Sequence, residues 1–282
     1  YTLLTSPVPN QKLIHIHNHP EELGSVYQGE LLIASGMPEV AAMLAEMAPV
    51  DASAWKASIA EAKAELAAFQ QEPPIFKDQD VPLNLWQVVQ DVMEVLPKDT
   101  ILTNGAGNYA SWAHRFYCYG GRRSQLAPTN GAMGYGVPAG IAAKISHPER
   151  CVLTFSGDGD YMMNGQELAT AVQYQAGVII IVFNNQMYGT IRMHQERDYP
   201  GRVSGTQLHN PHFAALARAY GAHGEVVETT ADFLPALQRA YAHTQAHKLP
   251  AVIELRYDGN LITPNATLET IRKNAEAAKQ KA

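Results

Sequence analysis

Residues 151–160 read Cys-Val-Leu-Thr-Phe-Ser-Gly-Asp-Gly-Asp, and residues 178–185 read Val-Ile-Ile-Ile-Val-Phe-Asn-Asn. Each stretch is a short apolar run typical of a buried strand, and each ends in side chains that carry oxygen. A helical pattern at 164–175 separates them, which favours two parallel strands joined by a helix. In such sheets ligands bind at the carboxyl ends of the strands. We therefore expect the functional site where these two strands end.

The same alternation of helices and short apolar strands extends to both sides of this pair. It predicts helices at 84–95, 131–145, 211–220 and 231–243, and strands at 100–103, 225–227 and 251–256. The expected fold is an α/β domain whose parallel sheet is sandwiched by helices. Further upstream the pattern predicts strands at 12–17 and 31–34, a short helix at 37–47 and a longer helix at 52–70.

Composition argues against several classes of function. The 282 residues are 46% hydrophobic and 17% charged, with a net charge of -6 and no cluster of Lys and Arg, which argues against nucleic acid as a partner. The longest apolar run, 178–183, is much shorter than the roughly 20 residues of a membrane helix, so we expect no membrane partner. Cys118 and Cys151 form no disulfide framework, and we expect both to be packing residues in a cytoplasmic protein.

The two strand ends carry the chemistry of a metal-bridged diphosphate site. Gly157 and Gly159 let the backbone approach an anion, the following helix offers free N–H groups, and Asp158 supplies a hard oxygen ligand. Asn185 also lies two residues beyond a strand, and neighbouring parallel strands are about 4.8 Å apart. Both side chains can therefore reach one Mg²⁺. Gly-Asp-Gly alone has two alternative interpretations, a plain turn and a dinucleotide fingerprint. Met162 contradicts the fingerprint, because it stands where the third glycine is required.

The order of these motifs resembles that of thiamine-diphosphate-dependent enzymes. The pattern is Gly-Asp-Gly, a helix, an apolar strand and then Asn-Asn, with 185 - 158 = 27 positions between Asp158 and Asn185. The acetolactate synthase, pyruvate oxidase and 2-oxo acid decarboxylase group is most similar, because residues 130–138 (Asn-Gly-Ala-Met-Gly-Tyr-Gly-Val-Pro) and 187–192 (Met-Tyr-Gly-Thr-Ile-Arg) also fit. The resemblance covers residues 80–258 and implies the C-terminal diphosphate-binding domain, with thiamine diphosphate and Mg²⁺ as cofactors.

The resemblance also implies roles for individual residues. Side chains of Asp158 and Asn185 and the carbonyl of Met187 would bind Mg²⁺, while backbone amides of Gly159, Asp160 and Gly189 would face the diphosphate. The carbonyl of Gly131 would contact the aminopyrimidine, and Met133 would hold the cofactor bent, with simple core filling as its alternative role. The complete expected cofactor set is Gly107, Asn108, Gly131, Met133, Gly157, Asp158, Gly159, Asp160, Asn185, Met187 and Gly189.

The resemblance extends to domain organisation and partners. Residues 1–70 would be the end of a central α/β domain plus a connecting helix, followed by a linker at 71–82, the cofactor domain at 83–262 and a polar tail at 263–282. Because Tyr1 to about Val50 resembles the end of the central domain of three-domain members, we expect a chain truncated upstream. In this family the glutamate that activates the cofactor lies on the N-terminal domain of a partner subunit, so we assign that role to no residue here. An identical subunit in a dimer or tetramer is the expected partner, with residues 131–145 suited to the contact.

Two further patterns have open interpretations. His15, His17 and His19 alternate along a strand and could suggest a metal site, but we expect a structural or solvated role because such triples need convergent partners. Relatives often carry acidic residues near here that contact a nucleotide such as FAD, and their absence predicts no flavin. Arg192 or His194, in the segment 192–202, could meet a substrate carboxylate; the alternative is a solvated charged loop.

The expected activity is addition of the thiamine ylide to a 2-oxo acid, release of CO₂ and transfer of the product to a proton or a second carbonyl compound. Acetolactate synthase-like decarboxylation and carboligation is the leading hypothesis. Simple 2-oxo acid decarboxylation is the alternative among enzymes. A non-catalytic cofactor-fold module for assembly or regulation is the alternative of another class.

Overall fold

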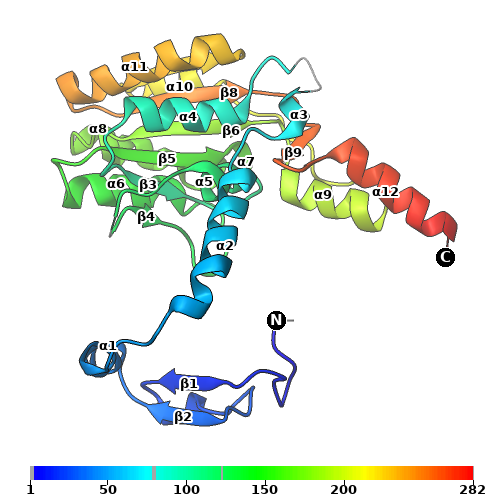
Figure 1. Cartoon of the computed structure of the whole chain (residues 1–282). Helices are drawn as coiled ribbons and strands as arrows, with labels where there is room; N and C mark the ends of the chain where they lie inside the picture. The colour runs from blue at the N-terminus through cyan, green and yellow to red at the C-terminus, as the bar shows by residue number, and fades with distance from the viewer. Residues whose placement is uncertain (1–2, 78–80, 122, 282) are drawn as a thin grey trace. The chain divides into compact units, whose positions relative to one another are not determined.

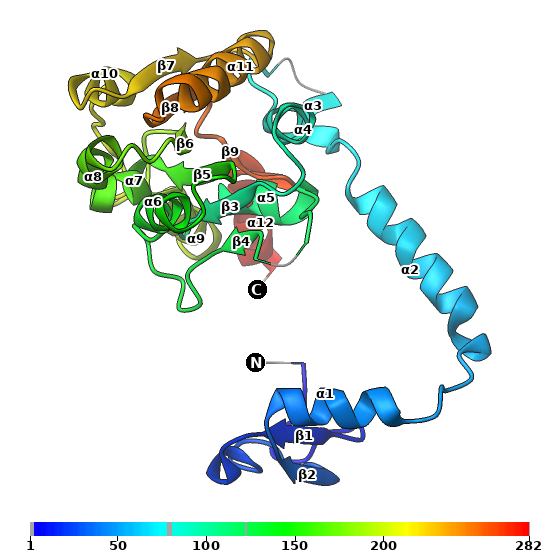
Figure 2. The same cartoon turned by 90° about the vertical axis from the view of Figure 1, so that its left-hand side faces the viewer.

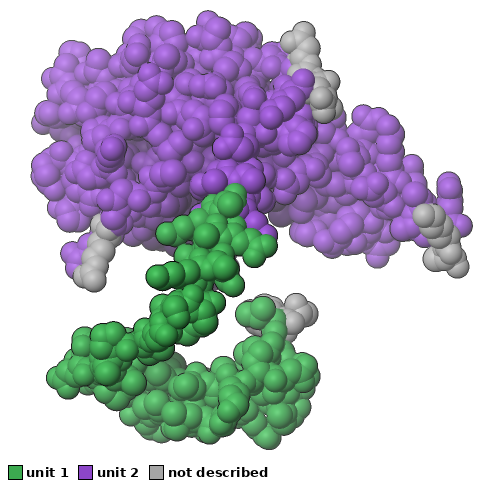
Figure 3. Space-filling model, in the orientation of Figure 1, with its two compact units in different colours: residues 1–64 green, residues 65–282 purple. Residues whose placement is uncertain are grey.

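The computed structural model describes residues 3–77, 81–121 and 123–281. The chain divides into two compact units, Tyr1–Ala64 and Glu65–Ala282, each of which is described by itself (Figure 3). The first part of the expected linker forms a short helix, α3 (Pro74–Lys77), while residues 78–80 lie outside the described residues.

The first unit is small and has little core. Strand β1 (Ile14–His17) pairs in parallel with β2 (Leu31–Ala34), which confirms both predicted strands, and the 3₁₀ turn η1 (Pro20–Glu22) lies between them. Helix α1 (Met37–Glu46), the turn η2 (Ser53–Trp55) and helix α2 (Lys56–Phe69) follow, as the sequence predicts. Val40 is the single buried residue among those described in this unit. Nδ1 of His17 accepts the backbone N–H of His19, a local turn contact.

The second unit is built on a six-stranded sheet whose strands are all parallel, which confirms the predicted α/β fold. The strand order is β4-β3-β5-β6-β8-β7, and five of these strands are labelled in Figure 1 and β7 in Figure 2. The strands are β3 (Ile101–Asn104), β4 (Gln125–Leu126), β5 (Val152–Gly157), β6 (Ile179–Asn184), β7 (His223–Val227) and β8 (Ala251–Arg256). Every residue of β5 and β6 is buried, because helices cover both faces of a parallel sheet.

Alternate residues of each strand enter two separate cores. In β6, Ile179, Ile181 and Phe183 pack with helices α4 (Leu85–Val95), α5 (Ala110–Phe116) and α11 (Thr230–His247). Ile180 and Val182 pack on the other face with α6 (Gly136–Ser146), α8 (Leu168–Gln173) and α10 (Phe213–Ala219). Figure 2 shows α6 and α8 on one side of the strands and α4 on the other. This arrangement follows from the two-residue period of a strand.

Several expected boundaries were wrong. The helix expected at 164–175 begins earlier, as α7 (Asp158–Asn164), and continues through the turn η3 (Gly165–Glu167) into α8, because the chain enters a helix directly at the end of β5. The helix expected at 131–145 begins at Gly136, since the glycine-rich segment before it forms turns. Most of the segment 192–202, for which a solvated charged loop was one of two interpretations, belongs to helix α9 (Gly189–Asp198).

The polar C-terminal tail forms a helix whose described residues are mostly exposed. The antiparallel pair β9 (Leu261–Thr263) and β10 (Ala266–Thr267) leads into helix α12 (Leu268–Lys281), which packs against α9. Of the two cysteines, Cys151 is buried as expected, whereas Cys118 is exposed and is not a packing residue. None of the described helices combines the length and apolar character needed to cross a membrane.

Candidate functional site

A cavity of about 430 Å³ lies in the second unit, beyond the carboxyl ends of β3, β5 and β6. Its lining includes all the residues that the sequence suggested for the cofactor: Gly107, Asn108, Gly131, Met133, Gly157, Asp158, Gly159, Asp160, Asn185, Met187 and Gly189. The structure adds several that sequence reasoning missed, among them Tyr109, Phe183, Tyr188, Thr190, Ile191, Tyr257 and Ile262. The cavity is therefore formed by five loop or strand-end segments that are distant in sequence.

Of the two carboxylates in this set, Asp158 is the one that has no ion pair and no hydroxyl donor among the residues that the structure describes. Its side chain is 3% exposed, and its Oδ1 accepts the backbone N–H of Gly159 at 2.8 Å. Oδ2 accepts Nδ2 of Asn210 at 2.8 Å. Burial raises the pKa of Asp158 above its ordinary value, against the lowering effect of these hydrogen bonds. A buried carboxylate without a counter-charge is costly, and a bound cation would remove that cost.

Asn185 supplies a second oxygen close to the same strand ends. Gly157 of β5 lies opposite Phe183 of β6 in the sheet, so the residues that follow them leave the sheet side by side. Oδ1 of Asn185 accepts the backbone N–H of Met187 at 3.2 Å, which fixes the turn that leads into α9. The carboxylate of Asp158 and the amide oxygen of Asn185 thus both lie at these strand ends and would give a donor set made of oxygen atoms. This donor set suits a hard divalent cation that takes its remaining ligands from a bound phosphate group.

No group of three His, Cys, Asp or Glu side chains converges to hold a metal among the residues that the structure describes. A cation in this cavity would therefore depend on amide, carbonyl and ligand oxygens in addition to Asp158. Such a mixed set is typical of Mg²⁺ bound together with a diphosphate rather than of a metal held by the protein alone.

Gly159 allows the ring of Tyr188 to pack directly on the backbone at the first turn of α7. A Cβ atom on this residue would lie 2.5 Å from Cε1 of Tyr188, closer than any relaxed contact. Gly159 also lines the cavity, so the backbone at the start of α7 borders it without a side chain of its own. The N–H groups of a helix start are a suitable site for an anion.

The side chain of Asp160 joins three segments of the cavity wall. Its carboxylate accepts hydrogen bonds from the hydroxyls of Tyr109 at 2.9 Å and Ser156 at 2.5 Å, and from the backbone N–H of Gly134 at 2.6 Å. Burial, together with the charge of Asp160, raises the pKa of Tyr109 well above its ordinary value. The phenol therefore remains a hydrogen-bond donor at neutral pH. Asp160 thus holds the glycine-rich turn and the segment after β3 in place.

The segment after β3 is also tied to the start of α9. The backbone N–H of Asn108 donates to the hydroxyl of Thr190 at 3.0 Å, and Nδ2 of Asn108 contacts Sδ of Met193 at 3.4 Å. Gly107 and Asn108 consequently border the cavity on the side of α9.

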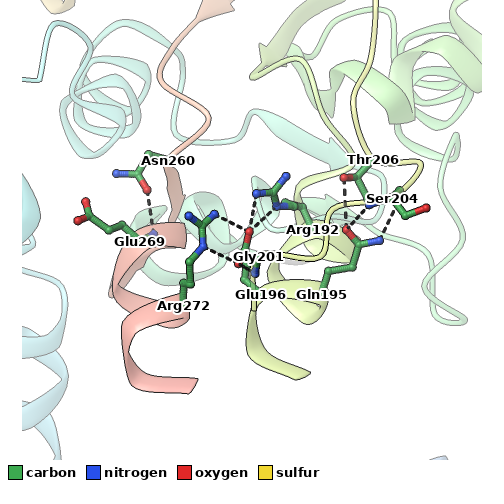
Figure 4. Close-up of polar contacts among 9 residues, drawn as sticks. All are labelled: Arg192, Gln195, Glu196, Gly201, Ser204, Thr206, Asn260, Glu269 and Arg272. Carbon is green, nitrogen blue, oxygen red and sulfur yellow. Dashed lines mark hydrogen bonds and ion pairs between the residues drawn. The ribbon is translucent and has the colours of Figure 1, made fainter. Parts of the chain in front are cut away.

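Neither Arg192 nor His194 lines this cavity. Arg192 forms an ion pair with Glu196, a carboxylate only 1% exposed that also binds Arg272 of α12 (Figure 4). His194 is exposed on α9. Arg192 is thus paired in a helix contact, and residues 189–198 form helix α9 and not a solvated loop. Arg192 also lines a second cavity that shares Asn185, Met187 and Tyr257 with the first, and its contact with a substrate stays a prediction.

Asn210 is the most informative residue that sequence reasoning missed. Its Nδ2 donates to Oδ2 of Asp158 at 2.8 Å and to Oδ1 of Asn184 at 2.9 Å, across 52 and 26 positions of the chain. The sequence signal around it, Asn-Pro before a helix, indicates only where α10 begins. No local pattern indicates the contact with Asp158.

Comparisons with known proteins agree with this architecture. Residues 105–255 match the family described as "Thiamine pyrophosphate enzyme, C-terminal TPP binding domain". The chain is 30% identical over 275 residues to a probable acetolactate synthase large subunit of Methanocaldococcus jannaschii, covering 93% of this chain and 46% of that protein. It is 31% identical over 253 residues to the acetolactate synthase isozyme 1 large subunit of Escherichia coli K12 (89% and 43%), and 32% identical over 262 residues to the Corynebacterium glutamicum large subunit (87% and 40%).

The chain spans about half the length of the relatives it matches, or somewhat less. The matched region contains β5, β6 and most of the cavity lining described above. The parallel sheet, the cavity at its strand ends and the sequence similarity all lead to the same assignment. This chain belongs to the family of thiamine-pyrophosphate-dependent enzymes, through their C-terminal cofactor-binding domain.

Proposed function

We propose that this chain is the cofactor-binding part of a thiamine-diphosphate- and Mg²⁺-dependent enzyme that converts a 2-oxo acid by acetolactate synthase-like decarboxylation and carboligation. The observation that carries the proposal is the convergence of Asp158, Asn185 and the start of α7 on one cavity of about 430 Å³. The similarity to acetolactate synthase large subunits supports the choice of reaction.

Different residues would bind the metal ion, the diphosphate and the aminopyrimidine of the cofactor. The side chains of Asp158 and Asn185, with the carbonyl of Met187, would hold Mg²⁺, while the amides of Gly159, Asp160 and Gly189 would face the diphosphate. The carbonyl of Gly131 would accept a hydrogen bond from the aminopyrimidine, and Met133 would pack beneath the cofactor.

The remaining lining sets the environment of the reaction. Phe183, Ile191 and Ile262 give the cavity apolar walls, which limit the access of water. Thiamine diphosphate, when bound, supplies the carbon nucleophile and the electron sink for decarboxylation. The chain itself positions the cofactor and excludes solvent around the reacting group.

The proposal includes a domain arrangement and a partner. Residues 83–262 form the cofactor domain, 1–70 the end of a preceding domain with a connecting helix, 71–82 a linker and 263–282 a tail. The working unit is a dimer or tetramer of identical cytoplasmic subunits, in which a partner subunit supplies the activating glutamate.

Calorimetric titration of the full-length protein with thiamine diphosphate and Mg²⁺ tests the binding part of this proposal. We expect wild-type protein to bind both, and Asp158→Ala to lose measurable binding because the charged metal ligand is absent. Asp51→Ala, which removes an exposed carboxylate of the first unit, is the matched control and should bind normally. Absence of binding to the wild type would refute the proposed function.

Product analysis with pyruvate tests the reaction. Formation of acetolactate supports carboligation, whereas release of free acetaldehyde alone supports simple decarboxylation. Either product requires the cofactor, so the analysis separates the two reactions only after binding has been established.

A further inference from the structure

We propose that Asn210 is a positioning residue that sets the orientation of the Asp158 carboxylate for Mg²⁺. The inference rests on the proposed function, in which Asp158 is the charged metal ligand. Nδ2 of Asn210 lies 2.8 Å from Oδ2 of Asp158, and the opposite oxygen of that carboxylate accepts the N–H of Gly159 at 2.8 Å. Both oxygens are therefore held, and the plane of the carboxylate is defined.

These hydrogen bonds leave the carboxylate able to bind a cation. Each oxygen of an ionised carboxylate has two lone pairs, and each oxygen of Asp158 accepts one of the hydrogen bonds described. These two bonds leave a second lone pair on each oxygen unused. Without Asn210, Oδ2 loses the side-chain donor that lies 2.8 Å away, and the carboxylate can rotate about its Cβ–Cγ bond away from the binding geometry.

Asn210 is itself oriented by a chain of hydrogen bonds. Its Nδ2 also donates to Oδ1 of Asn184 at 2.9 Å, so both of its N–H groups are used. Nδ2 of Asn184 in turn donates to Oε1 of Glu254 at 2.9 Å. Because a carboxylate accepts and does not donate, Glu254 determines which end of Asn184 faces Asn210. That choice forces Asn210 to present its donor to Asp158.

Glu254 is the last residue of this series of hydrogen bonds, and its position is fixed because its side chain is fully buried and accepts several hydrogen bonds. It has 0% exposure on β8, an interior strand of the sheet, and accepts Nε of Arg256 at 2.8 Å and the backbone N–H of Ala214 at 3.2 Å. Burial acts to raise the pKa of Glu254, but hydrogen bonds from Arg256 and Asn184 hold this pKa below its ordinary value. An ionised carboxylate on a rigid strand thus anchors the orientation of Asp158 through two amides.

The location of Asn210 explains how it reaches both partners. It directly precedes Pro211 and His212, and Nδ1 of His212 caps α10 by accepting the N–H of Ala215 at 3.2 Å. The start of α10 is therefore fixed beside the ends of β5 and β6. Loss of a side chain that hydrogen-bonds to a metal ligand often lowers the metal affinity by a factor of about 10–100.

Mg²⁺ titrations of the full-length protein at saturating thiamine diphosphate, followed by calorimetry, test this role. Asn210→Leu keeps nearly the same shape but lacks both donors, and we expect the Kd for Mg²⁺ to rise about 10–100-fold. Asn265→Leu, which replaces an exposed asparagine, is the matched control and should keep the wild-type Kd. A residue needed only for folding would lower the thermal unfolding temperature without changing the Kd of the folded protein.

The possible outcomes separate the two proposals. If the wild type binds Mg²⁺ and Asn210→Leu binds it equally well, the positioning role is overturned and the proposed function stands. If the wild type binds no cofactor, both fall together. Should Asn210→Leu fail to fold, Asn210→Ser decides the matter: it is too short to bridge Asp158 and Asn184, so a wild-type Kd in this variant also overturns the inference.

Discussion

Replacing Glu196 with glutamine removes a single negative charge from the contact between α9 and α12 and preserves the shape of the side chain. Oε2 of Glu196 accepts Nε of Arg272 at 2.7 Å, and Oε1 accepts Nη2 of Arg272 at 2.6 Å and Nε of Arg192 at 3.0 Å. Oε2 also accepts the backbone N–H of Gly201 at 3.0 Å. The carboxylate therefore joins α12, α9 and the turn after α9 (Figure 4).

The pKa of Glu196 provides the expected magnitude. Hydrogen bonds from Arg272, with smaller contributions from Gly201 and Arg192, lower this pKa to about 2 from its ordinary value of 4.5. Each pKa unit is worth about 1.4 kcal/mol, so the lowering corresponds to roughly 3 kcal/mol. Loss of one partner of a buried ion pair usually costs about 3–5 kcal/mol. We expect a loss at the lower end of this range, about 3 kcal/mol, because the side chain of Arg272 is 38% exposed and water can solvate its charge.

Urea unfolding of wild type and Glu196→Gln measures this difference. A loss of about 3 kcal/mol with an m value near 3 kcal/mol per molar lowers the midpoint by about 1 M. Glu276→Gln, an exposed position on the same helix α12, is the control and should change the free energy of unfolding by less than about 0.5 kcal/mol. A midpoint for Glu196→Gln that matches the control would refute the assignment of this carboxylate to the helix contact.

The pH dependence of the same difference tests its electrostatic origin. Because the pKa of Glu196 is lowered in the folded protein, its contribution is fully present above about pH 4.5 and is lost as the pH falls towards 2. The difference in the free energy of unfolding between wild type and Glu196→Gln should therefore be largest near neutral pH and smaller in acid. A difference that stays constant over this range would mean that packing, not charge, causes the loss of stability.

Two further predictions concern burial. A Cβ on Gly140 would lie 2.2 Å from Oγ1 of Thr154 and 3.0 Å from Oγ1 of Thr103, so Gly140→Ala should lower the free energy of unfolding by about 1–3 kcal/mol; unchanged stability would contradict this packing. Cys118 is exposed, whereas Cys151 is buried and burial raises its pKa to about 11. A thiol reagent should therefore label only Cys118 in native protein and both cysteines after denaturation; rapid native labelling of Cys151 would contradict its burial.

The alternation of apolar strands and helices was sufficient to predict the α/β fold and most of its strands. The pattern is readable because burial of a parallel strand on both faces requires a continuous apolar run, as in residues 152–157 and 179–184. The location of the cavity could also be predicted, because residues that follow the carboxyl ends of neighbouring parallel strands lie at one edge of a sheet. These features depend on short stretches of chain whose physical requirements are local.

The contacts that orient the candidate site depend on tertiary structure. Asn210 and Asp158 are 52 positions apart, and Arg272 and Glu196 are 76 positions apart, so no local pattern relates them. The sequence did not indicate helix α9, because its single buried residue is the carboxylate Glu196, which leaves no apolar stripe typical of a helix. Only the folded chain supplies the arginines that make burial of this charge possible, and only the folded chain brings an amide donor to the candidate metal ligand.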